Sequence, residues 1–230
     1  GFTNAQAQNN GSGFIYNEES LLFEMGLIMG TSSSVLFDNV RGASGVYNQD
    51  FTSASRIKKI TPGERSFSEV TGSFRNAPVA GTESLQVSYR SLVWKEDPYR
   101  NFIILEYKIR NTAQVNVSNF FMGIFADWDI LAGGSSDRAS WDDDSRLGYV
   151  FPAQPSNLPR AGIQALSGNA NYFAIDNDQT VAGNPFGLYD GFTDAEKFTS
   201  ISSGTGKVQA GGTNGRDVSH VVGSGPHSIP

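Results

Sequence analysis

The chain has 230 residues, no cysteine and a formal net charge of −6. This acidic balance argues against a nucleic-acid binder, because neutralising phosphates requires a surplus of Lys and Arg on one face. The missing cysteines exclude disulfides, thiolate metal sites and cysteine nucleophiles. No uninterrupted apolar run approaches the roughly 20 residues of a membrane-spanning helix, so we expect no membrane insertion.

The composition favours strands joined by tight turns. Glycine is abundant at 26 residues, aromatic residues make up 12% of the chain, and blocks of helix-favouring residues are scarce. We therefore predict an all-β fold, a single antiparallel β-sandwich with long loops and at most one or two short helices. Residues 1–13 are predicted to be a polar lead or linker and residues 14–230 the sandwich domain. The polar start and the Gly-rich end suggest a segment of a longer chain.

The first half of the sandwich is predicted to hold a buried hairpin and a three-stranded meander. Residues 21–29 are apolar on both faces and, with residues 35–40, predict a central hairpin. Residues 41–65 show no clear period. Residues 83–94, 102–110 and 117–130 follow as strands that we expect to pair in sequence, and in 102–110 apolar and charged side chains alternate as in a half-buried strand.

The second half is predicted to contain short strands, one helix and an irregular tail. Strands are expected at 146–151, 160–166 and 171–175, separated by turn residues. Thr193 or Asp194 can cap a short helix that ends before Gly204. Residues 202–215 are rich in Gly, Ser and Thr and predict a mobile loop. His220 and His227 would then lie near the surface of a Gly-rich tail without a closing strand.

A group of aspartates is the strongest chemical signal in the chain. Asp127 and Asp129 are two residues apart, so on a strand they point to the same side. The loop that ends in Asp142, Asp143 and Asp144 could fold back toward them. Such hard oxygen ligands suit calcium, although the order of residues is not that of an EF-hand.

The predicted metal ligands are therefore Asp127, Asp129, Asp142 and Asp144, with calcium as the cofactor. Two other interpretations of this acidic group stay open. Clustered charges are commonly a solvated turn, and a pair of carboxylates could serve a glycosidase.

No catalytic residue is predicted. The run from Gly30 to Ser32 resembles the nucleophile turn of subtilisin-like proteases, but the residues after it favour a strand. No histidine precedes His220 to act as a base for that serine. The spacing of His220 and His227 also fits no compact zinc site.

Three tryptophans leave a carbohydrate-binding module open as an alternative function. Trp128 lies on the apolar face of its strand and is predicted to be in the core. Trp94 and Trp141 lie at the ends of elements and are freer to stack on sugar rings.

Residues 21–230 resemble a β-rich domain found downstream of the catalytic domain in secreted subtilisin-like serine peptidases of Bacteroidetes-type bacteria. The matching pieces are EMGLIMGTSSSVLFDNVRG, NFIILEYKIRNT, FFMGIFADWDI, RLGYV and GSGPHSIP. The resemblance implies an extracellular or cell-surface accessory module that supports or spaces the protease domain of a hydrolase. Its Ser-His-Asp machinery would lie outside this chain, so the chain itself would not be an enzyme. Its partners would be neighbouring domains of the same polypeptide, and an extracellular protein or polysaccharide.

Overall fold

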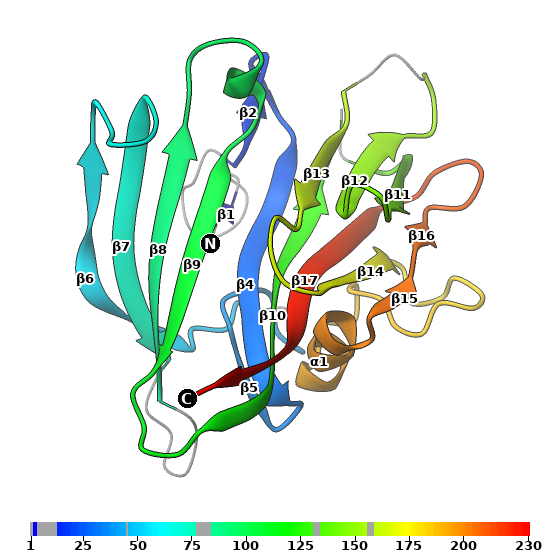
Figure 1. The fold of residues 1–230 in the computed structure, drawn as a ribbon. Coiled ribbons are helices and arrows are strands. Elements are labelled where there is room, and N and C mark those ends of the chain that lie inside the picture. Colours follow the sequence, from blue (N-terminus) through cyan, green and yellow to red (C-terminus); the bar gives the residue numbers. More distant parts are fainter. Residues whose placement is uncertain (1, 4–12, 45, 77–83, 131–133, 156–158) are drawn as a thin grey trace. The chain divides into compact units, whose positions relative to one another are not determined.

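The computed structural model describes residues 2–3, 13–44, 46–76, 84–130, 134–155 and 159–230. It contains 54% strand and 6% helix, which confirms the predicted all-β fold with few helical residues. The chain divides into two compact units (Figure 1). Unit 1 comprises residues 1–48 and 118–228, and unit 2 comprises residues 49–117 with the last two residues. Residues 4–12 of the predicted polar lead lie outside the described residues.

A main sheet runs through unit 1 in the strand order β1-β4-β10-β17-β14-β15, with β5 paired to β4. The β4–β5 pairing confirms the predicted hairpin. Strand β14 pairs in parallel with β15, whereas β4 with β10 and β14 with β17 are antiparallel. The strands are β1 (Phe2–Thr3), β4 (Leu22–Ser32), β5 (Val35–Asp38), β10 (Val117–Trp128), β14 (Ala170–Asp176), β15 (Thr205–Lys207) and β17 (Val218–Ile229).

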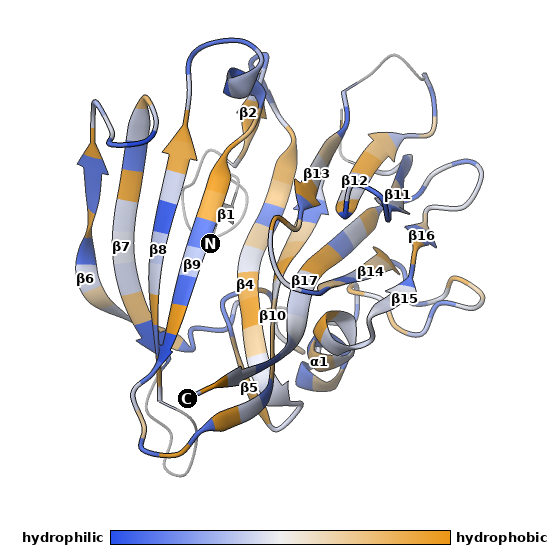
Figure 2. Cartoon of the chain, viewed as in Figure 1, coloured by the Kyte–Doolittle hydropathy of each residue, from blue (hydrophilic) through white to orange (hydrophobic). Residues whose placement is uncertain are grey.

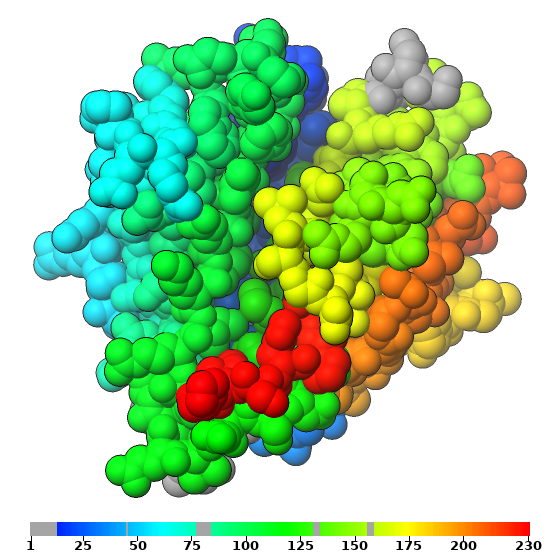
Figure 3. Space-filling view, viewed as in Figure 1, coloured from blue at the N-terminus to red at the C-terminus, as the bar shows by residue number. Residues whose placement is uncertain are grey.

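A smaller sheet completes a β-sandwich within unit 1. Its order is β13-β12-β11-β16, and a separate hairpin joins β2 to β3. Met25, Ala126 and Val222 of the main sheet share one buried cluster with Ala139 and Val150 of the smaller sheet. Figure 3 shows β16 in orange beside the yellow-green strands of this sheet. The strands are β2 (Ile15–Tyr16), β3 (Glu19–Ser20), β11 (Asp137–Asp142), β12 (Leu147–Pro152), β13 (Ala161–Gln164) and β16 (Gln209–Ala210).

The helix α1 (Asp194–Ser202) contributes to a second core on the main sheet. Phe125, Ile175 and Val221 from three strands form a buried cluster with Phe192 and with Ile201 of α1. The main sheet is thus buried on both faces, which explains why residues 22–29 are apolar on both faces. Neither α1 nor any other helix in the described part of the chain is long and apolar enough to cross a membrane.

Unit 2 is a four-stranded antiparallel meander in the order β6-β7-β8-β9. The register pairs Tyr107 with Tyr89 on one face and Glu106 with Arg90 on the other. This confirms the predicted alternation in residues 102–110, and Figure 2 shows alternating hydropathy along β8 and β9. The elements are β6 (Phe51–Ile60), β7 (Ser68–Asn76), β8 (Leu85–Val93), the 3₁₀ turn η1 (Tyr99–Asn101) and β9 (Ile104–Asn111).

The predicted pairing of residues 102–110 with residues 117–130 is wrong. Strand β9 pairs with β8, whereas β10 pairs with β4 in the other unit. The physical reason is that β10 carries apolar side chains on both faces and fits a doubly covered sheet, while β9 has one charged face. Strand β6 was also missed, because its exposed side chains and two register shifts leave no clear period.

The C-terminal tail is a long strand rather than an irregular end. Strand β17 occupies an interior position in the main sheet, and the predicted loop at 202–215 contains β15 and β16. The glycines of β17 hide its strand pattern in the sequence. Close packing against β10 explains the glycine at position 223. A Cβ at Gly223 would stand 2.7 Å from the carbonyl oxygen of Met122 on β10, so only glycine permits this close approach.

The start of α1 is fixed by a capping box at Thr193, one of the two capping residues that the sequence predicted. The Thr193 hydroxyl accepts a hydrogen bond from the Glu196 backbone N–H, and the Glu196 carboxylate accepts one from the Thr193 N–H. We expect Thr193→Ala to lower the free energy of unfolding by about 1 kcal/mol. Urea denaturation followed by circular dichroism measures the loss. The control, Thr193→Ser, keeps a hydroxyl and should stay close to the wild-type value.

Candidate functional site

Three aspartates meet at one end of the main sheet of unit 1. Asp127 is near the end of β10, Asp129 follows that strand, and Asp217 immediately precedes β17. One carboxylate oxygen of each lies within 4.8 Å of those of the other two. The strands β10 and β17 are neighbours, and this brings residues far apart in the sequence to one place.

Arg41 links two buried carboxylates beside this group. Its Nε lies 2.6 Å from Oε2 of Glu24, its backbone N–H donates to Oε1 of the same residue at 2.8 Å, and its guanidinium also donates to Oδ2 of Asp127. Glu24 and Asp127 are directly opposite each other on the paired strands β4 and β10, so their side chains share a face. A single cation therefore neutralises two adjacent acids.

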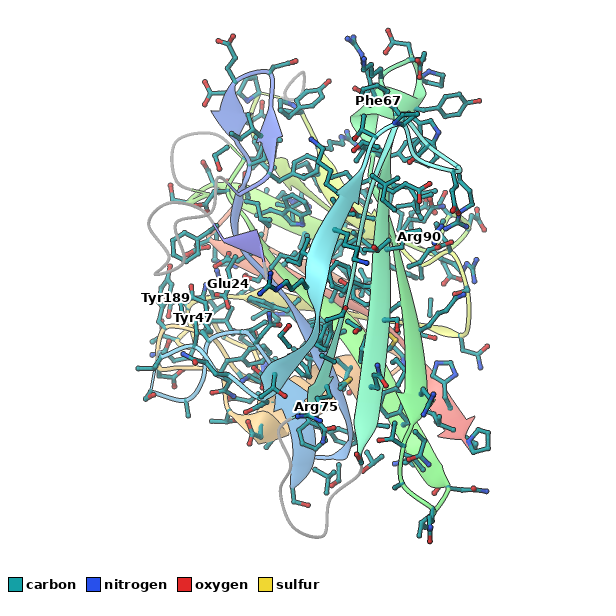
Figure 4. The ribbon with its side chains drawn as sticks, turned by 90° about the vertical axis from the view of Figure 1, so that its left-hand side faces the viewer. Glu24, Tyr47, Phe67, Arg75, Arg90 and Tyr189 are labelled. Carbon is teal, nitrogen blue, oxygen red and sulfur yellow. The ribbon has the colours of Figure 1, made fainter. Side chains whose placement is uncertain are left out.

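Neutral donors satisfy the other oxygens of two of these aspartates. The Asn177 amide donates to Oδ1 of Asp127 at 3.2 Å and to Oδ1 of Asp217 at 2.6 Å. The Ser219 hydroxyl donates to Oδ1 of Asp127 at 2.9 Å, and the Tyr189 hydroxyl donates to Oδ2 of Asp217 at 2.9 Å. Figure 4 shows Tyr189, Tyr47 and Glu24 on the same side of the molecule.

Asp129 differs from its two neighbours. Within the described part of the chain, no side chain or backbone group donates a hydrogen bond to its carboxylate. Gly134, at φ +63°, packs directly against that carboxylate, and a Cβ there would overlap with Oδ1 of Asp129. The Asp129 carboxylate is thus half-buried, and none of the described residues occupies its lone pairs as a donor.

The charges of the site do not balance. Four carboxylates, those of Glu24, Asp127, Asp129 and Asp217, surround the single guanidinium of Arg41. Burial, together with the neighbouring charges of Asp127 and Asp217, raises the pKa of Asp129 to about 6. Burial also raises the pKa of Asp217. The site therefore favours the uptake of positive charge, either as protons or as a cation.

Asp137 at the start of β11 extends this acidic environment. Burial raises its pKa to about 7, and the charges of Asp129 and Asp217 act in the same direction. The Ile130 backbone N–H donates to its Oδ2 at 2.9 Å, which fixes the side chain beside the end of β10.

Of the four predicted metal ligands, the structure brings Asp127 and Asp129 together. Asp142 is the last residue of β11 and Asp144 lies in the turn that follows, and neither is a member of the close carboxylate group. There, Oδ1 of Asp142 accepts a hydrogen bond from the Ser145 backbone N–H at 3.3 Å, a local turn contact. The third member of the close carboxylate group is Asp217 rather than Asp142 or Asp144.

Sequence reasoning missed Asp217, Arg41 and Glu24. Asp217 was missed because nothing in the sequence paired the tail with β10. Glu24 carried a usable signal, since it is a lone charge within an otherwise apolar strand. A buried acid in a central strand requires a partner, and that partner is Arg41.

The prediction that His220 lies near the surface is wrong. It is fully buried on β17, and its Nε2 accepts a hydrogen bond from Nε1 of Trp128 at 3.0 Å. Burial lowers the pKa of His220 to about 3, so the ring is neutral at physiological pH. The predicted position of Trp128 in the core is confirmed.

No complete nucleophile–base–acid arrangement appears among the described residues. The Ser32 hydroxyl contacts that of Ser34 at 3.0 Å rather than a base. Ser224 Oγ lies 2.9 Å from Nε2 of His227, a pair the sequence reasoning did not identify. No described carboxylate contacts His227, so the third group that would orient this histidine is missing from the described part of the chain.

The other two tryptophans have different environments. Trp141 stacks on the buried Tyr172 with ring centroids 4.9 Å apart. In unit 2, Trp94 lies 6.4 Å from the ring of Tyr99 and 5.6 Å from that of Phe102. Tyr99 is 52% and Phe102 42% exposed, so these three rings form an accessible aromatic cluster.

Comparison with known proteins identifies no relative: no protein-family model, no curated protein and no solved structure matches the chain.

The raised pKa of Asp129 predicts how its removal changes stability. Below pH 4 both the folded and the unfolded chain hold this proton. Above pH 6 the carboxyl group of Asp129 is ionised in both states, and the folded protein no longer has the stability that this proton conferred at low pH. Without divalent cations, we therefore expect Asp129→Asn to stabilise the protein by about 1 kcal/mol at pH 7.5, after allowing for solvent screening. The gain should shrink as the pH falls from 6 and disappear below pH 4.

Urea denaturation in chelator at several pH values measures this difference. Asp144→Asn is the control, because this exposed aspartate lies outside the site and its replacement should change stability by no more than about 0.5 kcal/mol at any pH. A loss of stability in Asp129→Asn at pH 7.5 would contradict the repulsion described above.

Proposed function

We propose that this chain is a non-catalytic, β-rich accessory module whose acidic site binds a divalent cation, calcium by its ligand chemistry. The observation that carries the proposal is the group Asp127, Asp129 and Asp217, with three carboxylates within 4.8 Å and too little positive charge to balance them. Calcium accepts six to eight oxygen ligands at about 2.3–2.6 Å in flexible geometry, which such a group can supply together with water.

The cation would have a structural role. Asp129 offers a free carboxylate and Asp217 a half-buried one, while Asp127 is held by Arg41, Asn177 and Ser219. A cation bound between Asp129 and Asp217 would bring the chain after β10 and the chain before β17 together. It would also remove the repulsion that raises the pKa of Asp129.

The module would serve a secreted or cell-surface bacterial serine peptidase of the subtilisin-like type, supporting or spacing the protease domain. The sequence resemblance supports this role. So does the incomplete catalytic geometry in the described residues, where Ser32 has no base and His220 is buried against Trp128. A glycosidase is less well supported, because the oxygens of Asp127 already have partners and Asp142–Asp144 lie in a hairpin turn.

Calcium should raise the unfolding temperature of the purified chain relative to chelator, because a ligand that binds only the folded state stabilises it by mass action. At 100 times the dissociation constant the gain is about 2.7 kcal/mol. Differential scanning calorimetry over a series of calcium concentrations measures the shift.

The variants give this experiment a specific signature. Asp129→Asn and Asp217→Asn should lose the calcium response, and Asp129→Asn should do so while being more stable than the wild type in chelator at pH 7.5. Asp142→Asn and Asp144→Asn are matched controls and should respond like the wild type. The cation proposal fails if the wild type shows no shift at millimolar calcium, or if the two control variants are the ones that lose it.

Carbohydrate binding is a second candidate, favoured by the aromatic cluster of Trp94, Tyr99 and Phe102. Rings of this kind stack on the apolar faces of sugars. The cluster belongs to unit 2 and is independent of the aspartate site.

If this cluster binds polysaccharide, Tyr99→Ala should reduce the retardation of the chain in polysaccharide-containing native gels at least several-fold, through the loss of about 1 kcal/mol of stacking. Tyr189→Ala is the control, because Tyr189 is similarly exposed but lies at the aspartate site. Equal retardation of the wild type and Tyr99→Ala in every polysaccharide tested would remove this candidate.

A further inference from the structure

A buried lysine in unit 1 takes no part in the aspartate site. Lys197 projects from α1 and its side chain is fully buried, with Nζ 2.8 Å from Oδ2 of Asp38 at the end of β5. Asp38 is equally buried. Removing both charges from water costs several kcal/mol per ion, so this arrangement needs a physical reason.

A third reactive group shares the same oxygen. The side-chain amide of Asn48 donates to Oδ2 of Asp38 at 3.0 Å, and the Val40 backbone N–H donates to Oδ1 at 3.0 Å. An amine and a carboxamide thus contact one carboxylate oxygen. The Phe192 ring lies 5.7 Å from Nζ of Lys197, within the apolar cluster that includes Phe125 and Ile201.

We propose that Lys197 and Asn48 form an intramolecular amide bond in the folded protein, with Asp38 as the group that transfers the protons. The proposal rests on the contact of both side chains with one buried carboxylate oxygen, and it is independent of the cation site.

The reaction needs no oxidant and no cofactor. Asp38 accepts a proton from the Lys197 ammonium group, and the neutral Nζ attacks Cγ of Asn48. As the tetrahedral intermediate collapses, the bond from Cγ to Nδ2 breaks, and the departing nitrogen takes up one proton from Nζ by way of Asp38. A new bond joins Nζ to Cγ, one molecule of ammonia leaves, and the other proton that Nζ gives up stays on Asp38, which becomes a neutral carboxyl group.

Three features of the surroundings favour this step. Burial raises the pKa of Asp38, so that the proton can pass from Lys197 to the carboxyl group. Holding the groups together in the folded core replaces an encounter in solution, which is worth a large effective concentration. The product exchanges two buried charges for a neutral amide, which removes a desolvation cost.

The bond would also have a consequence for the architecture. The chain has no cysteine and therefore no disulfide. Asn48 is the last residue of unit 1 before the chain enters unit 2. An amide bond from Asn48 to Lys197 would tie α1 to the segment that leaves unit 1.

Intact-mass spectrometry of the purified chain tests the proposal directly. We expect the measured mass to fall below the sequence mass by one molecule of ammonia, and proteolysis with tandem spectrometry to recover a branched peptide joining Lys197 to Asn48. A mass equal to the sequence mass would overturn the proposal and leave Lys197 and Asp38 as an ion pair. Loss of water instead of ammonia would overturn it too, because the bond would then join Lys197 to Asp38.

Two variants separate this bond from other losses of ammonia. Asn48→Ala removes the acceptor, and Lys197→Arg keeps the positive charge while removing the amine. Both should show their full sequence masses. Asn214→Ala is the control, since the Asn214-Gly215 pair could lose ammonia through a succinimide, and this variant should still show the loss. An ammonia loss that persists in Asn48→Ala would overturn the assignment.

Discussion

The centre of unit 1 depends on the contact of one guanidinium with two buried carboxylates. Glu24 and Asp127 are neighbours on the paired strands β4 and β10, in a sheet that is covered on both faces. Without Arg41 they would be two adjacent uncompensated charges, each with a desolvation penalty of several kcal/mol. The pairing of β4 with β10 and the position of the chain after β5 are therefore linked through Arg41. The contact of Arg41 with Glu24 and Asp127 therefore also positions Asp127 in the aspartate site.

Arg41 neutralises only part of the charge that the fold collects. Asp129 and Asp217 come to the same end of the sheet because of the chain path around β10 and β17, and they bring no cation of their own. The surplus negative charge must be compensated by protons, by a metal ion or by hydration. The raised pKa of Asp129 indicates that hydration stabilises its charged form poorly. A site that is costly when empty gains more from binding, so its stability and its occupancy are coupled.

Local patterns in the sequence predicted local structure correctly. The alternation in residues 102–110, the doubly apolar run at 21–29 and the helix cap at Thr193 or Asp194 each depend on near neighbours in the chain. Contacts between distant segments could not be predicted in this way. Strand β17 is rich in Gly and Ser and shows no strand period, although its position in the sheet buries His220 and brings Asp217 to Asp127. The partner of Glu24 was equally hidden, because no local rule links it to Arg41.

The segment from Asp38 to Asn48 connects the two polar centres of unit 1. Asp38 contacts Lys197 of α1, Arg41 three residues later contacts Glu24 and Asp127, and Asn48 ends the unit beside Asp38. Val40 packs in the core beside α1, and the charged contacts of Asp38 and Arg41 hold the segment on either side of it. Any change that moves Arg41, such as the loss of negative charge at Asp127, acts on the same segment that Asp38 fixes. The aspartate site and the buried lysine are thus coupled by a short stretch of backbone, and they constrain together the point at which the chain leaves unit 1.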